Sequence, residues 1–312
     1  MPVLLLALSA AWLVSFLPAR VRAQEADEVI EEDAPLQPQF KYLVEGGFIG
    51  QGDTDIDRGG TMQVSRFDLG LASRNQLFDH LRWGNTAFFG VNDYDFDGGG
   101  FSRGNPWQTI LNLRLGTKLT YDFNEQWGVF VGGLLMFSAE TSASWGDAVT
   151  GGGMVGVEYR HSDTLFTSLG VAVVTQLEDD PNVTPSVGLN WLPTDRWAVR
   201  IGSVPASGGA VAAAEVAYRI FDPLVVGLGA LYNQRRFRLN SEGPVHNGVG
   251  EENNLPVRLR VGWNINDNIS LQFLGGVALS GELTLDDSSG RQLRSSDYDP
   301  AAYAGMRVVG AF

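Results

Sequence analysis

Residues 111–121 read LNLRLGTKLTY, and this stretch alternates between apolar and polar side chains. The apolar residues are at odd positions: Leu111, Leu113, Leu115, Leu119 and Tyr121. The residues at even positions are polar or glycine, and Thr117 is the one polar residue at an odd position. Successive side chains of a β-strand point to opposite faces, so the stretch predicts a strand with one apolar and one polar face. Residues 257–263, VRLRVGW, repeat the pattern.

Segments of this kind fill the chain from Phe40 onward and predict fourteen strands. We expect them at 41–50, 62–73, 81–92, 108–121, 127–137, 149–160, 165–176, 184–192, 197–204, 210–220, 224–235, 255–263, 269–279 and 302–312. No later segment holds 18 uninterrupted apolar residues, which excludes membrane-spanning helices. Segment 197–204 is short and 210–220 is rich in Ala. If both belong to a loop, twelve strands remain.

The connections between these strands alternate in length. One set is short: 74–80, 122–126, 161–164, 193–196, 221–223 and 264–268. The other set is mostly long and acidic: 51–61, 93–107, 138–148, 177–183, 236–254 and 280–301, with 205–209 as its short member. Tight turns on one rim and longer loops on the other are typical of an outer-membrane barrel. The fold class expected is therefore all-β, a closed antiparallel up-and-down transmembrane β-barrel.

The alternation alone leaves open which face meets lipid, because a soluble barrel has the same period. Fourteen strands enclose a lumen too wide for apolar side chains to fill, which favours a wet interior and a lipid-facing exterior. Aromatic residues on the apolar face also gather near the short turns, as they do at a membrane interface. This predicted aromatic girdle consists of Tyr42, Trp83, Tyr121, Trp127, Tyr159, Trp191, Trp197, Tyr218 and Trp263.

The N-terminal residues predict export. Residues 3–17 are an apolar run that Pro18 ends, and residues 21–23 (VRA) offer a small residue to a signal peptidase, so we expect a signal peptide over 1–23. Residues 24–39 carry six acidic residues and predict a disordered spacer ahead of a barrel domain at 40–312. Removal of the signal peptide takes away Arg20 and Arg22, which leaves 20 basic against 36 acidic residues, a net charge of −16.

Composition excludes several other classes of protein. The chain has no Cys and three His, which argues against thiolate metal sites, disulfides and a histidine-rich metal centre, so no cofactor or metal is expected. The whole-chain charge of −14 would repel nucleic acid. No phosphate-binding glycine loop precedes a predicted helix.

With its strand pattern and its last strand, MRVVGAF at 306–312, the sequence resembles bacterial outer-membrane β-barrel proteins and looks like a porin-like family among them. The resemblance implies an outer-membrane location and contact with outer-membrane lipid. It also implies that Phe312 serves as the signal that the barrel-assembly machinery reads.

The polar face of the predicted strands is basic. Its expected lumen-lining residues are Lys41, Arg66, Arg82, Arg114, Lys118, Arg160, Arg200, Arg219, Arg258, Arg260 and Arg307, with Glu45, Asp68, Glu158 and Glu215. Such charges must face water or one another. We therefore expect a water-filled channel for small polar or anionic solutes, selected by Arg and Lys. The alternative is a structural or adhesive barrel in which the same charges pair and no solute passes.

Two further hypotheses concern the long loops. Asp93, Asp95 and Asp97 match the opening of a D-x-D-x-D-G calcium-binding loop, but the acidic ligand at its twelfth position is absent. Asp53, Asp55 and Asp57 have the same spacing in another loop. These residues could share a divalent cation, and the alternative is an acidic rim exposed to water. A hydrolytic enzyme would need His246, since His80 and His161 fall in short turns. No nucleophile spacing accompanies His246, and no catalytic residue is assigned.

Overall fold

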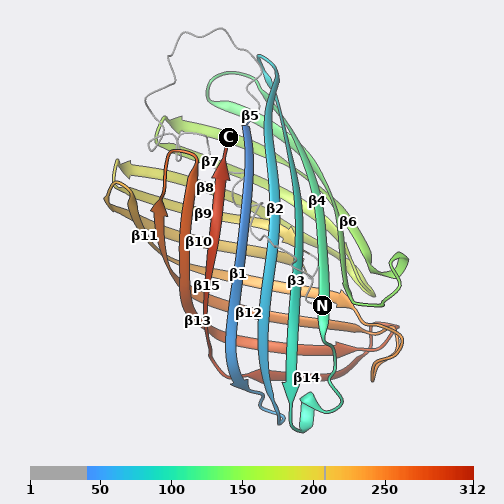
Figure 1. Cartoon of the computed structure of the whole chain (residues 1–312). Helices are drawn as coiled ribbons and strands as arrows, with labels where there is room; N and C mark the ends of the chain where they lie inside the picture. The colour runs from blue at the N-terminus through green and yellow to red at the C-terminus, as the bar shows by residue number, and fades with distance from the viewer. Residues whose placement is uncertain (1–40, 207–208) are drawn as a thin grey trace.

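The computed structural model describes residues 41–206 and 209–312, which are almost entirely sheet (Figure 1). The predicted signal peptide and acidic spacer lie outside the described residues. The strands are β1 (Lys41–Asp55), β2 (Thr61–Phe78), β3 (Leu81–Asp97), β4 (Thr109–Asp122), β5 (Trp127–Glu140), β6 (Val149–Ser162), β7 (Leu165–Gln176), β8 (Asp179–Thr194), β9 (Trp197–Ala206), β10 (Gly209–Phe221), β11 (Leu224–Arg238), β12 (Val249–Asn264), β13 (Ile269–Asp286), β14 (Gln292–Tyr298) and β15 (Ala301–Ala311). Two short 3-10 turns, η1 (Gly100–Ser102) and η2 (Gly146–Ala148), lie in loops.

The sheet closes on itself. Strands β1 to β12 pair in sequence order, β13 pairs with both β12 and β15, and β15 returns to β1, every one of these pairs being antiparallel. The ring therefore contains fourteen strands, while β14 is an added strand that pairs with the far end of β13. This confirms the predicted closed fourteen-strand barrel. The twelve-strand alternative is wrong, because 197–204 and 210–220 both form strands, β9 and β10.

The backbone hydrogen bonds between β1 and β15 continue to the last residue of the chain. The Tyr42 N–H donates to the Phe312 carbonyl at 2.7 Å, and the Phe312 N–H donates to the Tyr42 carbonyl at 2.8 Å. The ladder continues inward from Leu43 opposite Ala311. A closed ring leaves no edge strand there to be satisfied by water or another chain.

The outer face of the barrel is apolar. Side chains on it are between 43 and 61 % exposed, although they are among the most hydrophobic in the chain: Leu71, Leu115, Leu135, Val155, Leu169, Val171, Leu228, Leu259, Phe273 and Met306. Their strand neighbours on the other face, such as Glu158 and Arg307, are buried. A surface of this kind suits lipid and not water. Among the described residues, no helix is long and apolar enough to cross a membrane.

The six connections on one rim are turns of two to four residues, and we call this the short-turn rim. The opposite side, the loop rim, differs from the prediction, because many strands run several residues further there. Strand β3 continues to Asp97 instead of ending at 92. The predicted loop at 177–183 is also wrong: only residues 177 and 178 separate β7 from β8.

In these extensions the alternation changes sense. Along β3 the outward position Val91 is followed by Asp93, Asp95 and Asp97 on the same face, while the inward Tyr94 and Phe96 are buried. Above the lipid the outside of the strand meets water, so the polar residues now face outward and the apolar ones inward. The extended strands therefore build a small conventional core beyond the membrane-facing band.

This core, the aromatic cap, lies at the loop rim of the barrel. It consists of Ile56, Met62, Val64, Tyr94, Phe96, Phe101, Trp107, Ile110, Phe237, Leu239, Leu283, Leu285 and Tyr298. Trp107 is its centre, with ring centroids of Phe237 at 5.2 Å and Phe96 at 5.4 Å in edge-to-face contact. Such contacts add to the area that each ring buries.

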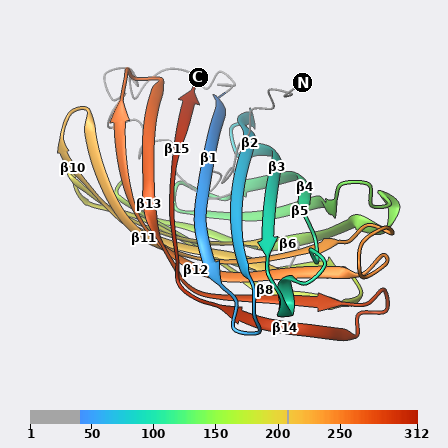
Figure 2. The ribbon, with the colours of Figure 1, turned by 60° about the horizontal axis from the view of Figure 1, so that its bottom comes forward.

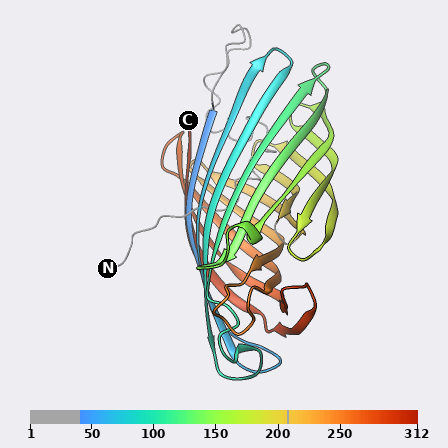
Figure 3. The ribbon, with the colours of Figure 1, turned by 90° about the vertical axis from the view of Figure 1, so that its right-hand side faces the viewer.

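The cap can form because strands from opposite walls meet. In Figure 2, β11–β13 run from the short-turn rim and then bend sideways, and in Figure 3 their far ends lie at the same end of the barrel as the tips of β1–β3. Arg238 of β11 forms a bridge to Ala139 of β5, six strands away around the ring. At this level the two walls are in contact across the interior.

Beneath the cap, one carboxylate joins five strands. Glu252 of β12 is fully buried and accepts hydrogen bonds from Arg66 of β2 at 2.7 Å, Tyr94 of β3 at 2.6 Å and Arg235 of β11 at 3.3 Å. Asn254 donates at 2.8 Å and Tyr298 of β14 at 3.2 Å. A buried carboxylate is tolerated only with such complete pairing.

We expect Glu252→Gln to lower the free energy of unfolding by about 3–5 kcal/mol, because it removes the counter-charge of the buried Arg66 and of the partly buried Arg235. Urea unfolding of the refolded barrel in detergent micelles, followed by tryptophan fluorescence, measures the change. The control is Glu282→Gln, an exposed carboxylate on β13, which we expect to change stability by less than about 0.5 kcal/mol. Equal losses in both variants would contradict the role assigned to Glu252.

Candidate functional site

Besides the Glu252 cluster beneath the aromatic cap, the interior of the barrel holds further clusters of charged side chains, and the first of these is strongly basic. Glu215 of β10 receives Arg260 of β12 through two hydrogen bonds, at 2.7 and 3.1 Å. Arg200 of β9 lies 3.3 Å from the same carboxylate and Arg258 of β12 lies 3.5 Å from it. Three guanidinium groups thus surround one carboxylate, which leaves a local excess of two positive charges.

Glycines on the neighbouring strands allow these side chains to lie along the wall. A Cβ at Gly227 of β11 would come within 3.1 Å of the Glu215 side chain and 3.3 Å of Arg260, and one at Gly262 within 3.2 Å of Arg260. Such distances are tighter than ordinary van der Waals contact, so larger residues there would push the charged groups toward the barrel axis. The Nε of Arg258 is buried without a hydrogen-bond partner among the described residues.

The second cluster is balanced in charge. Arg82 of β3 donates to both oxygens of Asp122, at 2.6 and 2.7 Å, and to Glu158 of β6 at 2.8 Å. Lys118 of β4 approaches the other oxygen of Glu158 at 2.5 Å and lies 4.3 Å from the ring centroid of Phe130. Two bases and two acids therefore compensate each other on the β3–β6 wall, and the positive excess lies on the β9–β12 wall.

The remaining predicted interior residues lie between or beside these clusters. Arg307 of β15 pairs with Glu45 of β1 at 3.8 Å, and both are buried. The Arg114 guanidinium lies 4.9 Å from the ring centroid of Phe88, and Asp68 is buried in the same wall.

Three predicted residues are placed differently. Arg160 of β6 is exposed close to the short-turn rim, and Arg219 lies 3.6 Å from Asp222 in a short turn. Arg66 belongs to the Glu252 cluster below the aromatic cap. For Lys41 only the backbone is described, at the start of β1.

The sequence analysis missed several buried charges: Glu140, Arg236, Arg238 and Asp286 lie in stretches that it assigned to loops, and three more charges inside the barrel were also missed. Glu252 was assigned to a loop because the predicted strand began at 255, and Asp122 stood one residue beyond the predicted end of β4. Arg235 lay inside its predicted strand, and the alternation along β11 could have found it. With these additions the interior is less basic than the predicted ratio of eleven to four.

The acidic stretches form strand rather than a cation-binding loop. Asp93, Asp95 and Asp97 project from the outer face of β3, where Asp93 accepts a hydrogen bond from Thr109 and Asp97 accepts one from the Gly98 N–H. Asp53 and Asp55 lie in β1, and Asp57 follows in a turn. Within residues 41–206 and 209–312, no group of three or more His, Cys, Asp or Glu side chains could hold a metal ion.

Another acidic residue of the loop rim is ordered by its own turn. Asp287, between β13 and β14, accepts hydrogen bonds from the Ser289 hydroxyl, the Ser289 N–H and the Arg291 N–H. These bonds favour the charged form, so the pKa of Asp287 lies below its usual range.

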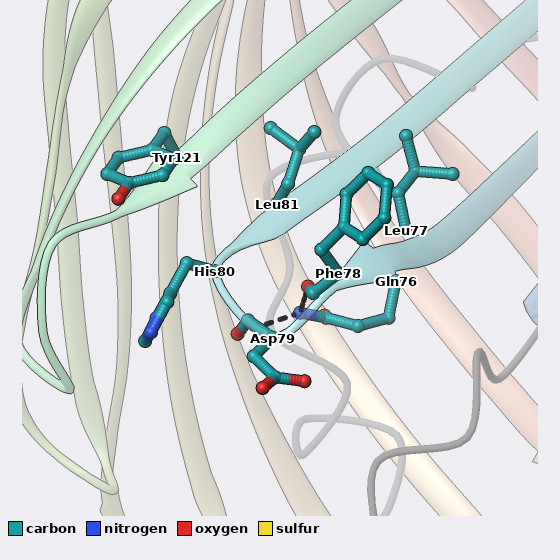
Figure 4. A pocket seen from close by; sticks show the side chains of 7 residues that line it. All are labelled: Gln76, Leu77, Phe78, Asp79, His80, Leu81 and Tyr121. Carbon is teal, nitrogen blue, oxygen red and sulfur yellow. Dashed lines mark hydrogen bonds between the residues drawn. The ribbon is translucent and has the colours of Figure 1, made fainter.

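A hollow of about 490 Å³ lies at the short-turn rim beside His80 (Figure 4). Its Gln76 amide donates to the backbone carbonyls of Phe78 and Asp79, and the His80 ring lies 6.3 Å from that of Tyr121. Figure 4 places the His80 and Asp79 side chains apart from each other at the open turn. None of the residues lining this hollow is Ser, Thr or Cys.

The other two histidines also have local partners. His161 Nε2 lies 3.0 Å from the Thr167 hydroxyl, and His246 Nδ1 contacts the Ser241 carbonyl. Both rings are exposed. A base-activated nucleophile needs a histidine that a third group, often a carboxylate, holds in place. Among the described residues, no carboxylate forms a hydrogen bond with either of these two histidines.

The residues of the predicted aromatic girdle lie beside the short turns. Trp127 and Tyr159, on β5 and β6, have ring centroids 4.4 Å apart, and Trp197 and Tyr218, on β9 and β10, are 4.7 Å apart. The aromatic ring of Phe312 is exposed on the same rim. Paired, exposed rings at one level are what the headgroup region of a bilayer favours.

Among solved structures, the chain is similar to several outer-membrane proteins. The COG4313 outer membrane channel from Pseudomonas putida F1 has 12 % identity and a TM-score of 0.45, over 91 % of this chain and 100 % of that one. The Pseudomonas putida toluene transporter TodX has 12 % identity and a TM-score of 0.40, over 88 % and 90 % of the two chains. The KdgM porin has 9 % identity and a TM-score of 0.30, over 84 % and 97 %.

No curated protein matches the sequence. One family does, over residues 98–308, which run from the end of β3 into β15 and make up about two thirds of the 312 residues. The chain belongs to this family, described as Domain of unknown function (DUF6268).

Proposed function

We propose that the barrel lies in the outer membrane and is a passive channel for small anionic solutes. The observation that carries this proposal is the Glu215 cluster, where Arg200, Arg258 and Arg260 surround one carboxylate inside the barrel. The chain as a whole is acidic, so a basic interior wall is not a consequence of composition. Rings of Arg and Lys select anions in pores.

Four further features support the location and route. The apolar outer face supports contact with outer-membrane lipid, and the exposed Phe312 beside Tyr42 supports recognition by the barrel-assembly machinery. The Arg200 side chain is 25 % exposed, so water reaches the basic wall. Because Gly227 and Gly262 have no side chains, Glu215 and Arg260 can lie close to the barrel wall, which leaves space near the axis.

The aromatic cap favours a second candidate, a structural barrel without conductance. Trp107 and the rings around it are almost fully buried, and the bridge between β5 and β11 crosses the interior. A barrel of this kind would be sealed along its axis at the loop rim. The two candidates differ in a single measurement, the conductance of the purified chain in a planar bilayer.

For the channel, we expect conductance steps and a reversal potential in a KCl gradient that indicates preference for chloride. The double variant Arg258→Ser/Arg260→Ser should lower the chloride-to-potassium permeability ratio by about tenfold, equivalent to about 1.4 kcal/mol. The control Arg103→Ser/Arg291→Ser removes the same charge from exposed loop residues and should change the ratio less than about twofold. Cation preference in the unmodified chain would refute the anion channel.

The cap is tested separately with Trp107→Ala/Phe237→Ala, which removes two contacting rings from its centre. If the cap seals the axis, this variant should raise the single-channel conductance several-fold over that of the unmodified chain. Steps that appear only in this variant would favour the structural barrel. An unchanged conductance would show that solutes do not pass through the cap.

A further inference from the structure

The wall of the barrel is incomplete between β8 and β9. Their ladder runs from Trp191 to Gly188, where Gly188 stands opposite Gly202, and no further backbone pair joins the two strands beyond it. Strand β8 nevertheless continues to Asp179: it pairs with β7 as far as Asn182 and again at Asp179, after a bulge at residues 180 and 181. Among the described residues, none pairs in a ladder with the β9-facing edge of residues 179–187.

Prolines in the sequence explain where the ladder stops. If the register continued, Pro185 would stand opposite Pro205, and neither has an N–H to donate. The Ser203 hydroxyl replaces the missing pair: it accepts from the Val187 N–H at 2.9 Å and donates to the Pro185 carbonyl at 3.0 Å. These two bonds show that residues 185 and 187 turn their backbone groups toward β9.

Backbone groups of alternate residues face the same side of a strand, so Val183 also faces the gap, whereas Pro181 lies in the bulge that interrupts the alternation. Pro185 has no N–H and the Val187 N–H is already bonded to Ser203, so the edge offers few donors to any added strand. A second copy of the chain would need those donors to pair with it. The sequence thus prevents the gap from closing by strand addition.

The gap lies at the level of the apolar outer face. Val183 and Val187, on the outer side of this edge, are 66 % and 40 % exposed, and Trp191 of the predicted girdle follows on the same face. A free backbone edge does not persist against hydrocarbon, and irregular backbone at membrane depth occurs where it lines a wet cavity. The edge of β8 therefore borders water.

The upper end of the gap is bridged by side chains. Arg236 of β11 donates to the Leu177 carbonyl at 2.8 Å, and Arg238 pairs with Glu178 in the same turn at 2.5 Å. On the inner side of β8, the Thr184 hydroxyl donates to Asn182 at 2.8 Å. The gap is thus bordered by β8, by the Val187–Ser203 contact and by the Arg236 and Arg238 contacts.

We propose that this gap is a lateral window through which amphiphilic organic anions exchange between the bilayer and the basic interior. Its outer border is apolar, its inner border is polar, and Arg200 of the Glu215 cluster lies on β9 beside it. A solute with an apolar body and one anionic group fits both sides. The proposal rests on the proposed function for the interior, but it assigns a route that does not cross the aromatic cap.

Access to the window is tested by single cysteines, which the cysteine-free chain makes specific. Thr184→Cys, at the window, should react both with a charged water-soluble maleimide and with a lipid-soluble pyrene maleimide. The control Gln272→Cys is a partly exposed interior position with complete ladders on both sides, and it should react with the water-soluble reagent at least about tenfold faster than with the lipid-soluble one. Val173→Cys faces lipid and should show the reverse preference.

Thr184→Cys that reacts like Gln272→Cys would overturn the window. So would disulfide-linked dimers of Val183→Cys, which would show that a second copy covers the edge. Each variant is refolded and compared with the unmodified chain by circular dichroism before labelling, so that a misfolded barrel is recognised.

Transport is tested with 8-anilinonaphthalene-1-sulfonate, an amphiphilic anion, in proteoliposomes. A bulky thiol adduct on folded Thr184→Cys should reduce its transfer by at least about fivefold and leave chloride conductance within about twofold, whereas the same adduct on Val173→Cys should change neither. Equal transfer with and without the Thr184 adduct would overturn the window. Absence of chloride conductance in the unmodified chain would instead refute the proposed channel, and the labelling pattern separates the two failures.

Discussion

The requirement that every backbone N–H and C=O find a partner governs this molecule. In hydrocarbon no water can supply that partner, so the sheet must close, and it does so through the β1–β15 and β12–β13 ladders. The same requirement gives meaning to the incomplete ladder between β8 and β9. Prolines on β8 remove donors from that edge, and a serine hydroxyl satisfies two of the remaining groups.

The membrane-facing part of the fold could be predicted from sequence because one physical pattern operates throughout it. Apolar residues face out and polar residues face in, so alternation over stretches such as 111–121 identifies both the strand and its faces. Fourteen strands and their order followed from this pattern and from the turns between them. Segments 197–204 and 210–220, which carried the weakest pattern, are strands as well.

The part above the membrane could not be predicted in the same way. There the alternation changes sense, so DYDFD at 93–97 looks like an acidic loop, although it is a strand with Tyr94 and Phe96 in a core. The error hid Glu252, because its strand β12 begins at Val249, six residues before the predicted start at 255. The contacts of Glu252 with Arg66 and Tyr94 cross the barrel and depend on how the walls bend, which no local pattern contains.

For the interior charges too, the sequence predicts which face of a strand a residue lies on, but not which residues meet across strands. Alternation assigns Arg200, Glu215, Arg258 and Arg260 to one face, but it does not say that one carboxylate gathers three guanidinium groups. That arrangement depends on the register of four adjacent strands and on glycines that leave room along the wall.

The pairing of β1 with β15 sets an order on assembly. Leu43 and Ala311 are neighbours in the ladder, although 268 positions separate them in sequence. Bringing the ends of such a loop together costs an entropy that grows as the logarithm of its length, about 5 kcal/mol for this separation apart from a constant. Hairpins such as β2–β3 can form early and locally, whereas the ring is completed last, after its other strands have come together. Until then both terminal strands present open edges, and a catalyst that shields those edges would speed folding most at this final step.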